Sequence, residues 1–256
     1  LSYLKMKKEN NILVTILITS YNRLVDLKET IKRCHDITYK NLEIIIVDAG
    51  SNDGSAEYVK QLDNNYIKKI IEVNQGPCHS HGEGMKIANG KYIITIDDDC
   101  FINPNIVEET VKIFEKFPLL SAIGYGFINP NINFNEKVYN NKIDINIEDL
   151  EISLNKSQII ATSGAAFRSE SLKKIGYYDL DFYWADDKVL SLDLIANGFV
   201  TAKISSLVAF HKSSPSNRYF NERMYKTLID QIKLTVKFYP LKLLITTFYK
   251  IIFKSI

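Results

Sequence analysis

Apolar runs and segments with helical spacing alternate along the first hundred residues. The apolar runs predict strands over residues 12–19, 42–47, 67–73 and 92–96. Helical spacing lies between them, over residues 24–34, 55–62 and 79–88. Strands that are apolar on both faces and separated by helices are typical of a mostly parallel sheet with helices on both sides. The sequence therefore predicts an α/β fold.

Polar residues follow each of the four predicted strands. They are Thr19 to Arg23, Asp48 to Gly54, Asn74 to Gly76, and Asp97 to Asp99. Because ligands of such sheets bind beyond the carboxyl ends of the strands, these segments predict a binding site along one edge. Asp48 ends its strand, where its carboxylate is placed to accept a hydrogen bond from a nucleobase or ribose. A simple cap of the following turn is the alternative for Asp48.

Three consecutive aspartates, Asp97, Asp98 and Asp99, follow the fourth predicted strand. Like charges this close raise one another's pKa, so the cluster is costly without a cation. Asp97 and Asp99 alternate along extended backbone, so both side chains can share a hard ion such as Mg²⁺ or Mn²⁺. A solvated acidic turn is the alternative, and the buried strand before the triplet favours the metal site.

Composition narrows the class of protein. The chain has 256 residues, 46% of them hydrophobic, enough for one large domain or two fused small ones. A net charge of +2 gives no reason to expect a nucleic-acid partner. Three scattered cysteines suit a reducing compartment, and we find neither a signal segment nor an 18-residue apolar run. We therefore expect a cytoplasmic protein.

The second half carries a small-residue strand and an acidic pair. Residues 159–167 predict a strand in which Ser163, Gly164 and Ala165 let a ligand or another backbone approach closely. Asp186 and Asp187 open a helix predicted to end near residue 197. Acids in a first turn usually just favour the helix dipole, so the pair alone does not establish catalysis. His211 follows a further predicted strand over residues 200–210.

Three other segments have open interpretations. For the histidines in His79-Ser80-His81, which have no nearby acidic partners in the sequence, we expect surface or helix-cap roles rather than metal ligation. Residues 130–155 are Asn-rich and predict a long insertion that serves as a lid or acceptor-binding surface. Residues 239–256 mix large apolar side chains with lysines, which fits a helix in a membrane interface; packing on the core or on a partner is the alternative.

Across residues 12–103, the ordered motifs resemble the family 2 glycosyltransferases of the GT-A fold. The resemblance implies a nucleoside-diphosphate-sugar donor, with UDP-sugar favoured, and it implies that Asp97 and Asp99 form the DXD motif that holds Mn²⁺ or Mg²⁺. The implied donor site comprises Thr19, Tyr21, Arg23, Asp48, Asn74, Gly76 and Asp98. Ala49 departs from the family pattern, because many members have a second acid there.

The second half resembles the same family. There a small-residue strand precedes an aromatic loop and an acidic pair that opens a helix. The resemblance implies that Asp187 is the catalytic base, that Asp186 replaces the usual Glu, and that His211 completes the metal site. It also implies that Ser163, Gly164, Ala165 and Trp184 lie in the acceptor and donor-sugar region.

The sequence therefore predicts a GT-A-like, metal-dependent, inverting glycosyltransferase acting on a saccharide or lipid-linked acceptor, in the synthesis of cell-surface polysaccharide, glycolipid or glycan. We expect a donor-binding half over residues 1–103, an acceptor half over 104–218 and a helical segment over 219–256, with possible peripheral membrane contact. A nucleotidyltransferase or metal phosphohydrolase, and a non-catalytic nucleotide-sugar-binding protein, are the alternatives. No dinucleotide or Walker A glycine pattern is present.

Overall fold

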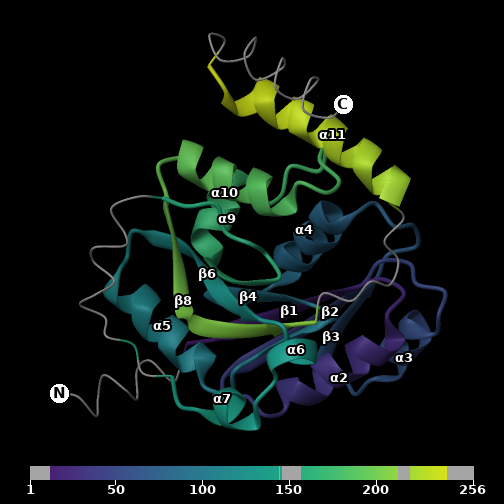
Figure 1. Cartoon of the computed structure of the whole chain (residues 1–256), viewed down its shortest axis with the longest axis vertical. Coiled ribbons are helices and arrows are strands. Elements are labelled where there is room, and N and C mark those ends of the chain that lie inside the picture. Colours follow the sequence, from purple (N-terminus) through teal and green to yellow (C-terminus); the bar gives the residue numbers. More distant parts are fainter. Residues whose placement is uncertain (1–11, 144, 146–156, 213–219, 241–256) are drawn as a thin grey trace.

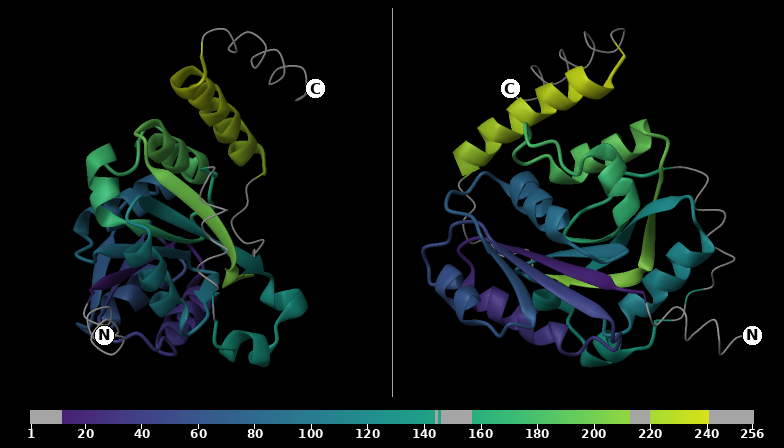
Figure 2. Two further views of the ribbon diagram at one scale, coloured as in Figure 1. Left: turned by 90° about the vertical axis from the view of Figure 1, so that its left-hand side faces the viewer. Right: turned by 180° about the vertical axis from the view of Figure 1, so that it is seen from behind.

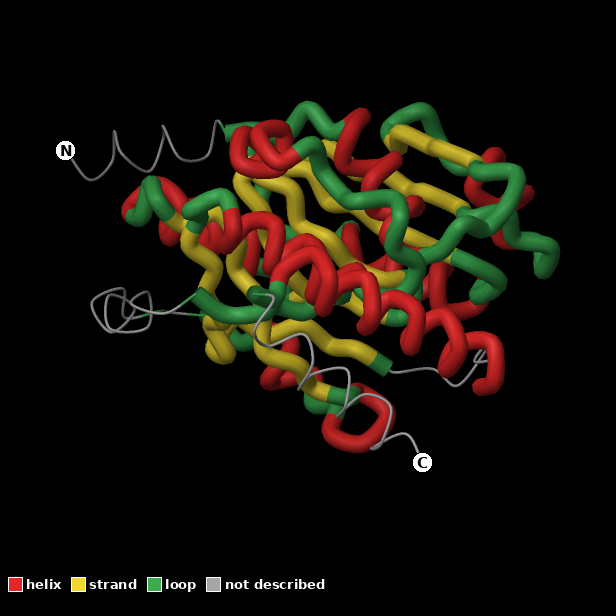
Figure 3. Tube along the Cα trace, turned by 90° about the horizontal axis from the view of Figure 1, so that it is seen from above, coloured by secondary structure: helices red, strands yellow, loops and turns green. Residues whose placement is uncertain are grey.

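The computed structural model describes residues 12–143, 145, 157–212 and 220–240. Within them, one eight-stranded sheet lies between two groups of helices (Figure 1). The strand order is β3-β2-β1-β4-β7-β6-β8-β5. Seen from above, the strands run side by side in one twisted sheet (Figure 3).

The first half of the sheet is parallel, as predicted. Its strands are β1 (Val14–Ser20), β2 (Leu42–Asp48), β3 (Tyr66–Ile70) and β4 (Tyr92–Asp97). The helices between them are α2 (Leu24–Cys34), α3 (Ser55–Gln61) and α4 (Pro77–Ile87). These elements match the apolar periodicity within a few residues, and the largest difference is β3, which ends three residues before the predicted boundary.

The second half of the sheet is mixed. Its elements are β5 (Cys100–Ile102), α5 (Ile106–Lys116), β6 (Leu120–Ile128), β7 (Gly164–Arg168) and β8 (Val200–His211). β7 is antiparallel to both β4 and β6, β5 is antiparallel to β8, and β6 is parallel to β8. The strand predicted over 159–167 begins only at Gly164. The sheet is therefore fully parallel in its first half and mixed in its second, where β6 and β8 form the parallel pair.

Two apolar clusters cover the two faces of the sheet. Strand residues alternate between them: Ile16 and Ile18 join the cluster with α2 and α5, whereas Leu17 joins the cluster with α4, α9 (Ser169–Ile175) and α10 (Asp186–Ala196). The view from behind shows the same layers (Figure 2). α4 lies very close to β1, because a Cβ added at Gly84 would be 2.3 Å from Leu17 Cδ1. This close approach brings the first turns of α4 to the end of β1.

The C-terminal helix α11 (Phe220–Phe238) lies outside α10, farthest from the sheet (Figure 1). Leu234 joins the apolar cluster beneath it, and Lys237 pairs with Asp179 and Asp193, both at 2.8 Å. The described part of the predicted 219–256 segment is therefore packed on the domain, while residues 241–256 lie outside the described residues. No helix in the described part of the chain is long and apolar enough to cross a bilayer.

The described part of the Asn-rich segment forms two short helices, α6 (Pro130–Asn133) and α7 (Glu136–Asn140). Its asparagines act locally: Asn129 accepts the N–H of Asn131, and Asn135 that of Lys137, at the two helix starts. Tyr139 anchors α7 in a cluster with two phenylalanines, Phe101 and Phe210.

Candidate active site

The carboxyl ends of the parallel strands meet at one cavity of about 410 Å³. Thr19 lies opposite Asp97 in the β1–β4 register, and Ser20 lies opposite Asp48 in the β1–β2 register. Two other cavities have similar volumes, about 450 and 480 Å³. Only the strand-end cavity among the three is lined by the acidic triplet and the Asp186–Asp187 pair, so its chemistry singles it out.

Most of the predicted site residues line this cavity: Thr19, Tyr21, Arg23, Asn74, Gly76, Asp97, Asp98, Asp99, Ser163, Trp184, Asp186, Asp187 and His211. Asp48, Gly164 and Ala165 do not. Asp48 is fully buried, and its Oδ1 accepts the N–H groups of Gly50 and Ser51, although the neighbouring Ala49 reaches the cavity. Gly164 and Ala165 lie inside β7. The described part of the Asn-rich segment contributes no lining residue either.

Asp97, Asp99 and His211 converge on one point, where their ligand atoms lie within 4.8 Å of one another. Pairing of Cys100 in β5 with His211 in β8 places the imidazole Nε2 3.1 Å from Asp99 Oδ1. The predicted extended backbone between the two acids is wrong, because β4 ends at Asp97 and Asp98 and Asp99 form a turn. Two carboxylates and an imidazole form a donor set that suits Mn²⁺ and also accommodates Mg²⁺.

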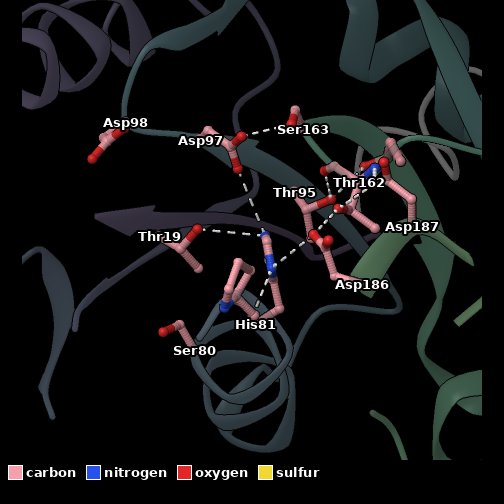
Figure 4. Close-up of polar contacts among 12 residues, drawn as sticks. Thr19, Ser80, His81, Thr95, Asp97, Asp98, Thr162, Ser163, Asp186 and Asp187 are labelled. Carbon is pink, nitrogen blue, oxygen red and sulfur yellow. Dashed lines mark hydrogen bonds and ion pairs between the residues drawn. The ribbon is translucent and has the colours of Figure 1, made fainter. Parts of the chain in front are cut away.

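Charge compensation around the triplet comes from Arg23. Its guanidinium lies 3.2 Å from Asp98 Oδ1 and 2.8 Å from Asp99 Oδ2. Asp98 Oδ2 accepts hydrogen bonds from the Ser20 hydroxyl and the Tyr21 N–H, so this carboxylate holds the loop after β1 (Figure 4 shows it turned away from His81). Burial raises the pKa of Asp98 to about 7, against the opposing charge of Arg23.

His81 lies at the centre of the site, so the predicted surface or helix-cap role is wrong (Figure 4). The residue is 1% exposed, and its Nε2 lies 3.4 Å from Thr19 Oγ1 and 3.9 Å from Asp97 Oδ1. Its Nδ1 lies 3.1 Å from the Pro77 carbonyl and 4.0 Å from Asp186 Oδ2. Burial lowers the pKa of His81, although the charge of Asp97 opposes this effect. The imidazole thus links the triplet to the acidic pair.

Thr162 is a second residue that sequence reasoning missed. Its N–H donates to Asp187 Oδ1 at 2.6 Å, and its hydroxyl lies 2.8 Å from Asp186 Oδ2 and 2.9 Å from Asp187 Oδ1. A hydroxyl has one proton, so both contacts are hydrogen bonds only if one carboxyl donates. Burial, followed by the charge of Asp187, raises the pKa of Asp186 to about 8. When Asp186 is protonated, its carboxyl can donate to the Thr162 hydroxyl, which then donates to Asp187, and both contacts are satisfied.

The two halves of the site also touch directly. Ser163 donates to Asp97 Oδ2 at 2.6 Å, which ties the segment before β7 to the end of β4. The aromatic ring of Tyr183 lies against Gly76, where an added Cβ would be 2.8 Å from ring carbons. Gly76 has φ +95°, a conformation that also favours glycine. The loop after β3 therefore fits under the loop that leads into α10.

Comparison with known proteins identifies the family of the chain. The model for "Glycosyl transferase family 2" matches residues 15–176. That range is more than half of the chain, so the chain belongs to glycosyl transferase family 2. The predicted class of enzyme, a glycosyltransferase, is thereby confirmed.

Named relatives agree with this family. The chain is 28% identical over 182 residues to a poly-beta-1,6-N-acetyl-D-glucosamine synthase of Staphylococcus epidermidis, covering 68% of the chain and 43% of the relative. It is 25% identical over 195 residues to the synthase of the same name from Staphylococcus aureus, covering 73% of the chain and 46% of the relative. The chain thus spans less than half the length of the curated relatives it matches.

Solved structures share the fold. A mannosyltransferase of Pyrobaculum calidifontis, in complex with GDP-Man and Mn²⁺, superposes with a TM-score of 0.66 at 16% identity, covering 92% of this chain and 70% of that one. TarS of S. aureus superposes with a TM-score of 0.61 at 14% identity, covering 88% and 66%. The predicted GT-A-like α/β fold is confirmed.

The raised pKa of Asp186 predicts a pH dependence of stability. Folded Asp186 keeps its proton up to about pH 8, whereas the unfolded chain releases it near pH 3.8. Its contribution to stability is therefore complete below about pH 4 and lost as the pH rises to about 8. Asp186→Asn does not titrate, so we expect its melting temperature, measured with chelator and without nucleotide, to gain on wild type between about pH 5 and about pH 8.5.

Asp53→Asn is the matched control for this measurement. Burial raises the pKa of Asp53, but hydrogen bonds from Ser55 and Leu24 outweigh it and leave the pKa lowered. Its contribution therefore changes only in acid, and its offset from wild type should stay constant over the same range. A constant offset for Asp186→Asn as well would contradict the protonated state of Asp186.

Proposed function

We propose that this cavity catalyses metal-dependent, inverting transfer of a sugar from a nucleoside-diphosphate-sugar to an acceptor hydroxyl. One observation carries the proposal: the Asp97–Asp99–His211 cluster and the carboxylate of Asp187 line the same cavity. A donor diphosphate needs the first group, and an attacking hydroxyl needs the second. Membership of glycosyl transferase family 2 supports the same reaction.

Each part of the cavity has a proposed role. Thr19, Tyr21, Asn74 and Gly76, together with Arg23 and Asp98, form the side that takes the nucleoside diphosphate. The buried Asp48 supports this side from behind, because it holds the turn at Gly50 and Ser51. Asp97, Asp99 and His211 would hold Mn²⁺ or Mg²⁺, which when bound neutralises the charge that develops on the departing diphosphate. Ser163 fixes the Asp97 carboxylate, and Trp184 lines the acceptor side together with Asp187.

Asp187 is the proposed general base. Its Oδ1 accepts two hydrogen bonds from Thr162, which fix the orientation of the carboxylate. As the acceptor hydroxyl attacks the anomeric carbon, its proton passes to Asp187 and the bond to the diphosphate oxygen breaks. A single displacement of this kind inverts the anomeric configuration. Asp186 keeps its own proton and orients the pair through Thr162.

The relatives support a proposal for the substrate class. Matched relatives are named as synthases of an N-acetylglucosamine polymer, and a TarS structure is described in complex with UDP. We propose a UDP-sugar donor and a saccharide or lipid-linked acceptor in cell-surface polysaccharide synthesis. The alternative functions, a nucleotidyltransferase or a non-catalytic nucleotide-sugar-binding protein, are less well supported. Neither of them gives Asp187 and its contacts with Thr162 a role.

We further propose that the protein works in the cytoplasm at the inner face of the membrane. The supporting observation is a set of exposed apolar side chains along α11 and at its end: Met224, Tyr225, Leu228, Val236 and Tyr239. The chain continues through residues 241–256, outside the described residues, with further apolar and lysine residues. Apolar residues interleaved with lysines suit an interface with anionic headgroups.

The metal assignment predicts that Asp97→Ala or Asp99→Ala abolishes Mn²⁺-dependent binding of UDP. The fold should persist, because each substitution also relieves repulsion within the triplet. Thermal shift with UDP, with and without Mn²⁺, measures this, since a ligand of the native state raises the melting temperature. Glu170→Ala, an exposed acid on α9, is the control and should keep the shift. If UDP with Mn²⁺ raises the melting temperature of Asp99→Ala as much as that of the wild type, the metal assignment is wrong.

The base assignment predicts that Asp187→Asn keeps UDP affinity and loses on the order of 10²–10⁴-fold in transfer rate, the usual contribution of a general base. Asparagine retains an oxygen for the Thr162 hydrogen bonds, so the structure should be preserved. Transfer from a UDP-sugar is measured as UDP release that depends on acceptor. Asp186→Asn is the matched variant and should lose less; the reverse order would make Asp186 the base.

The membrane assignment predicts that anionic liposomes retain the chain and that deleting residues 239–256 releases it. Neutral lipid should hold the chain less well, and added salt should weaken binding, because exposed charges are screened. Co-sedimentation checks this, with UDP binding as the control for an intact cavity. If the deletion instead lowers the melting temperature and liposomes never retain the full chain, the segment packs on protein.

A further inference from the structure

Asp230 on the C-terminal helix α11 is buried although it carries a carboxylate, being 2% exposed. Its Oδ2 accepts three consecutive backbone N–H groups, from Tyr183 at 3.1 Å, Trp184 at 2.6 Å and Ala185 at 3.2 Å. Hydrogen bonds from N–H groups to an ionised carboxylate are stronger than those to a neutral acceptor. A group buried and satisfied in this way fixes the backbone that it binds.

The three N–H groups belong to the approach to α10, whose N-cap is Ala185. The first N–H groups of a helix have no partner inside the helix, and a negative charge there is also favoured by the helix dipole. The N-cap residue is an alanine, whose side chain cannot make a capping hydrogen bond. Asp230 therefore holds the two residues before α10 and satisfies the N–H of its N-cap, Ala185, from a different helix more than forty residues later in the chain.

The segment that Asp230 holds leads directly into the residues of the proposed chemistry. Trp184 lines the cavity, and Asp186 and Asp187 follow directly as the first residues of α10. On its other side the same segment is held by Thr162 through Asp187. Tyr183 presses on Gly76 in the donor half. The backbone that places Asp187 is thus held between Thr162 and Asp230.

Further contacts from α11 cover the same loop. The Arg223 guanidinium lies 5.0 Å from the ring centroid of Trp184, and the Lys226 ammonium lies 3.6 Å from that of Tyr183. Arg223 also lines the cavity. Cation–π contacts and the Asp230 hydrogen bonds come from one face of α11, so the helix acts on the loop as a unit.

We propose that Asp230 is a positioning residue that fixes the aromatic loop and, through the start of α10, the carboxylate of Asp187 relative to the bound donor. This role rests on the proposed function of Asp187. It makes α11 a part of the catalytic domain, because the helix sets the geometry of the acceptor side. Loss of the carboxylate lowers turnover and leaves the nucleotide side of the cavity unchanged.

Trp184 reports on the loop directly, because it is the single tryptophan of the chain. Asp230→Ala is expected to shift the Trp184 emission and raise its quenching by acrylamide. In the same variant kcat for sugar transfer falls on the order of 10²-fold, the usual effect of a small misplacement of a reacting group. The Kd of UDP with Mn²⁺ stays within about twofold of wild type. Asp230→Asn keeps an acceptor oxygen and restores part of both signals.

Lys237→Ala is the matched control on the same helix. It removes the ion pairs to Asp179 and Asp193 and leaves the loop hydrogen bonds in place. Its melting temperature should fall, whereas Trp184 emission and kcat should stay near wild type. Equal effects of Lys237→Ala and Asp230→Ala on emission and kcat, or unchanged emission in Asp230→Ala, would overturn the positioning role.

The fluorescence and turnover measurements separate the two levels of the proposal. A wild-type chain that binds UDP and transfers no sugar refutes the proposed function, and the emission and quenching of Trp184 still test the hold of Asp230 on the loop. An active wild type whose kcat is untouched in Asp230→Ala refutes the positioning role alone. If Asp230→Ala does not fold, Asp230→Asn against Lys237→Ala decides by the same measurements.

Discussion

Five aspartates lie close together at one edge of the sheet, and the contacts of the residues around them depend on this concentration of negative charge. Asp97, Asp98, Asp99, Asp186 and Asp187 line a single cavity, an arrangement that repulsion and burial both oppose. The protein meets the cost in different ways on the two sides. Arg23 neutralises part of the triplet, whereas the raised pKa of Asp186 and the donors of Thr162 relieve repulsion within the pair. The buried imidazole of His81, whose pKa burial lowers, lies between the two groups.

The sequence predicted the first half of the fold well because its signals are local. β1, β2 and β4 are mostly apolar runs with a polar segment at the end, so these elements and the binding edge follow from local patterning. β3, which contains Lys68 and Lys69, has the weakest pattern of the four and also the largest difference in its bounds. The second half was harder. α5 and β6 were not predicted. The antiparallel insertion of β7 depends on which strand pairs with which, and pairing is decided by contacts far apart in sequence. The order of the strands along the sequence does not show which strands pair.

The same distinction holds for the site. Motif residues such as Thr19 and Asn74 were found because a spacing pattern marks them. His81 was assigned to the surface because its acidic neighbours, Asp97 and Asp186, come from other segments of the chain. Thr162 and Asp230 carry no motif at all, since their role depends on backbone N–H groups or carboxylates supplied by the fold. One residue in the sequence does mark the close packing of α4 on β1. It is Gly84, where an added Cβ would collide with Leu17.

The β5–β8 pairing has a consequence for the order in which the protein is completed. Asp97 and Asp99 are synthesised early, whereas His211 joins them only after the last strand has paired with Cys100. Long-range strand pairing is a slow step in folding, and a chain emerging from the ribosome folds from its N-terminal end. The His211 imidazole is thus the last of the three proposed metal ligands to be placed. The complete set of ligands exists only in chains in which β8 has already paired with β5.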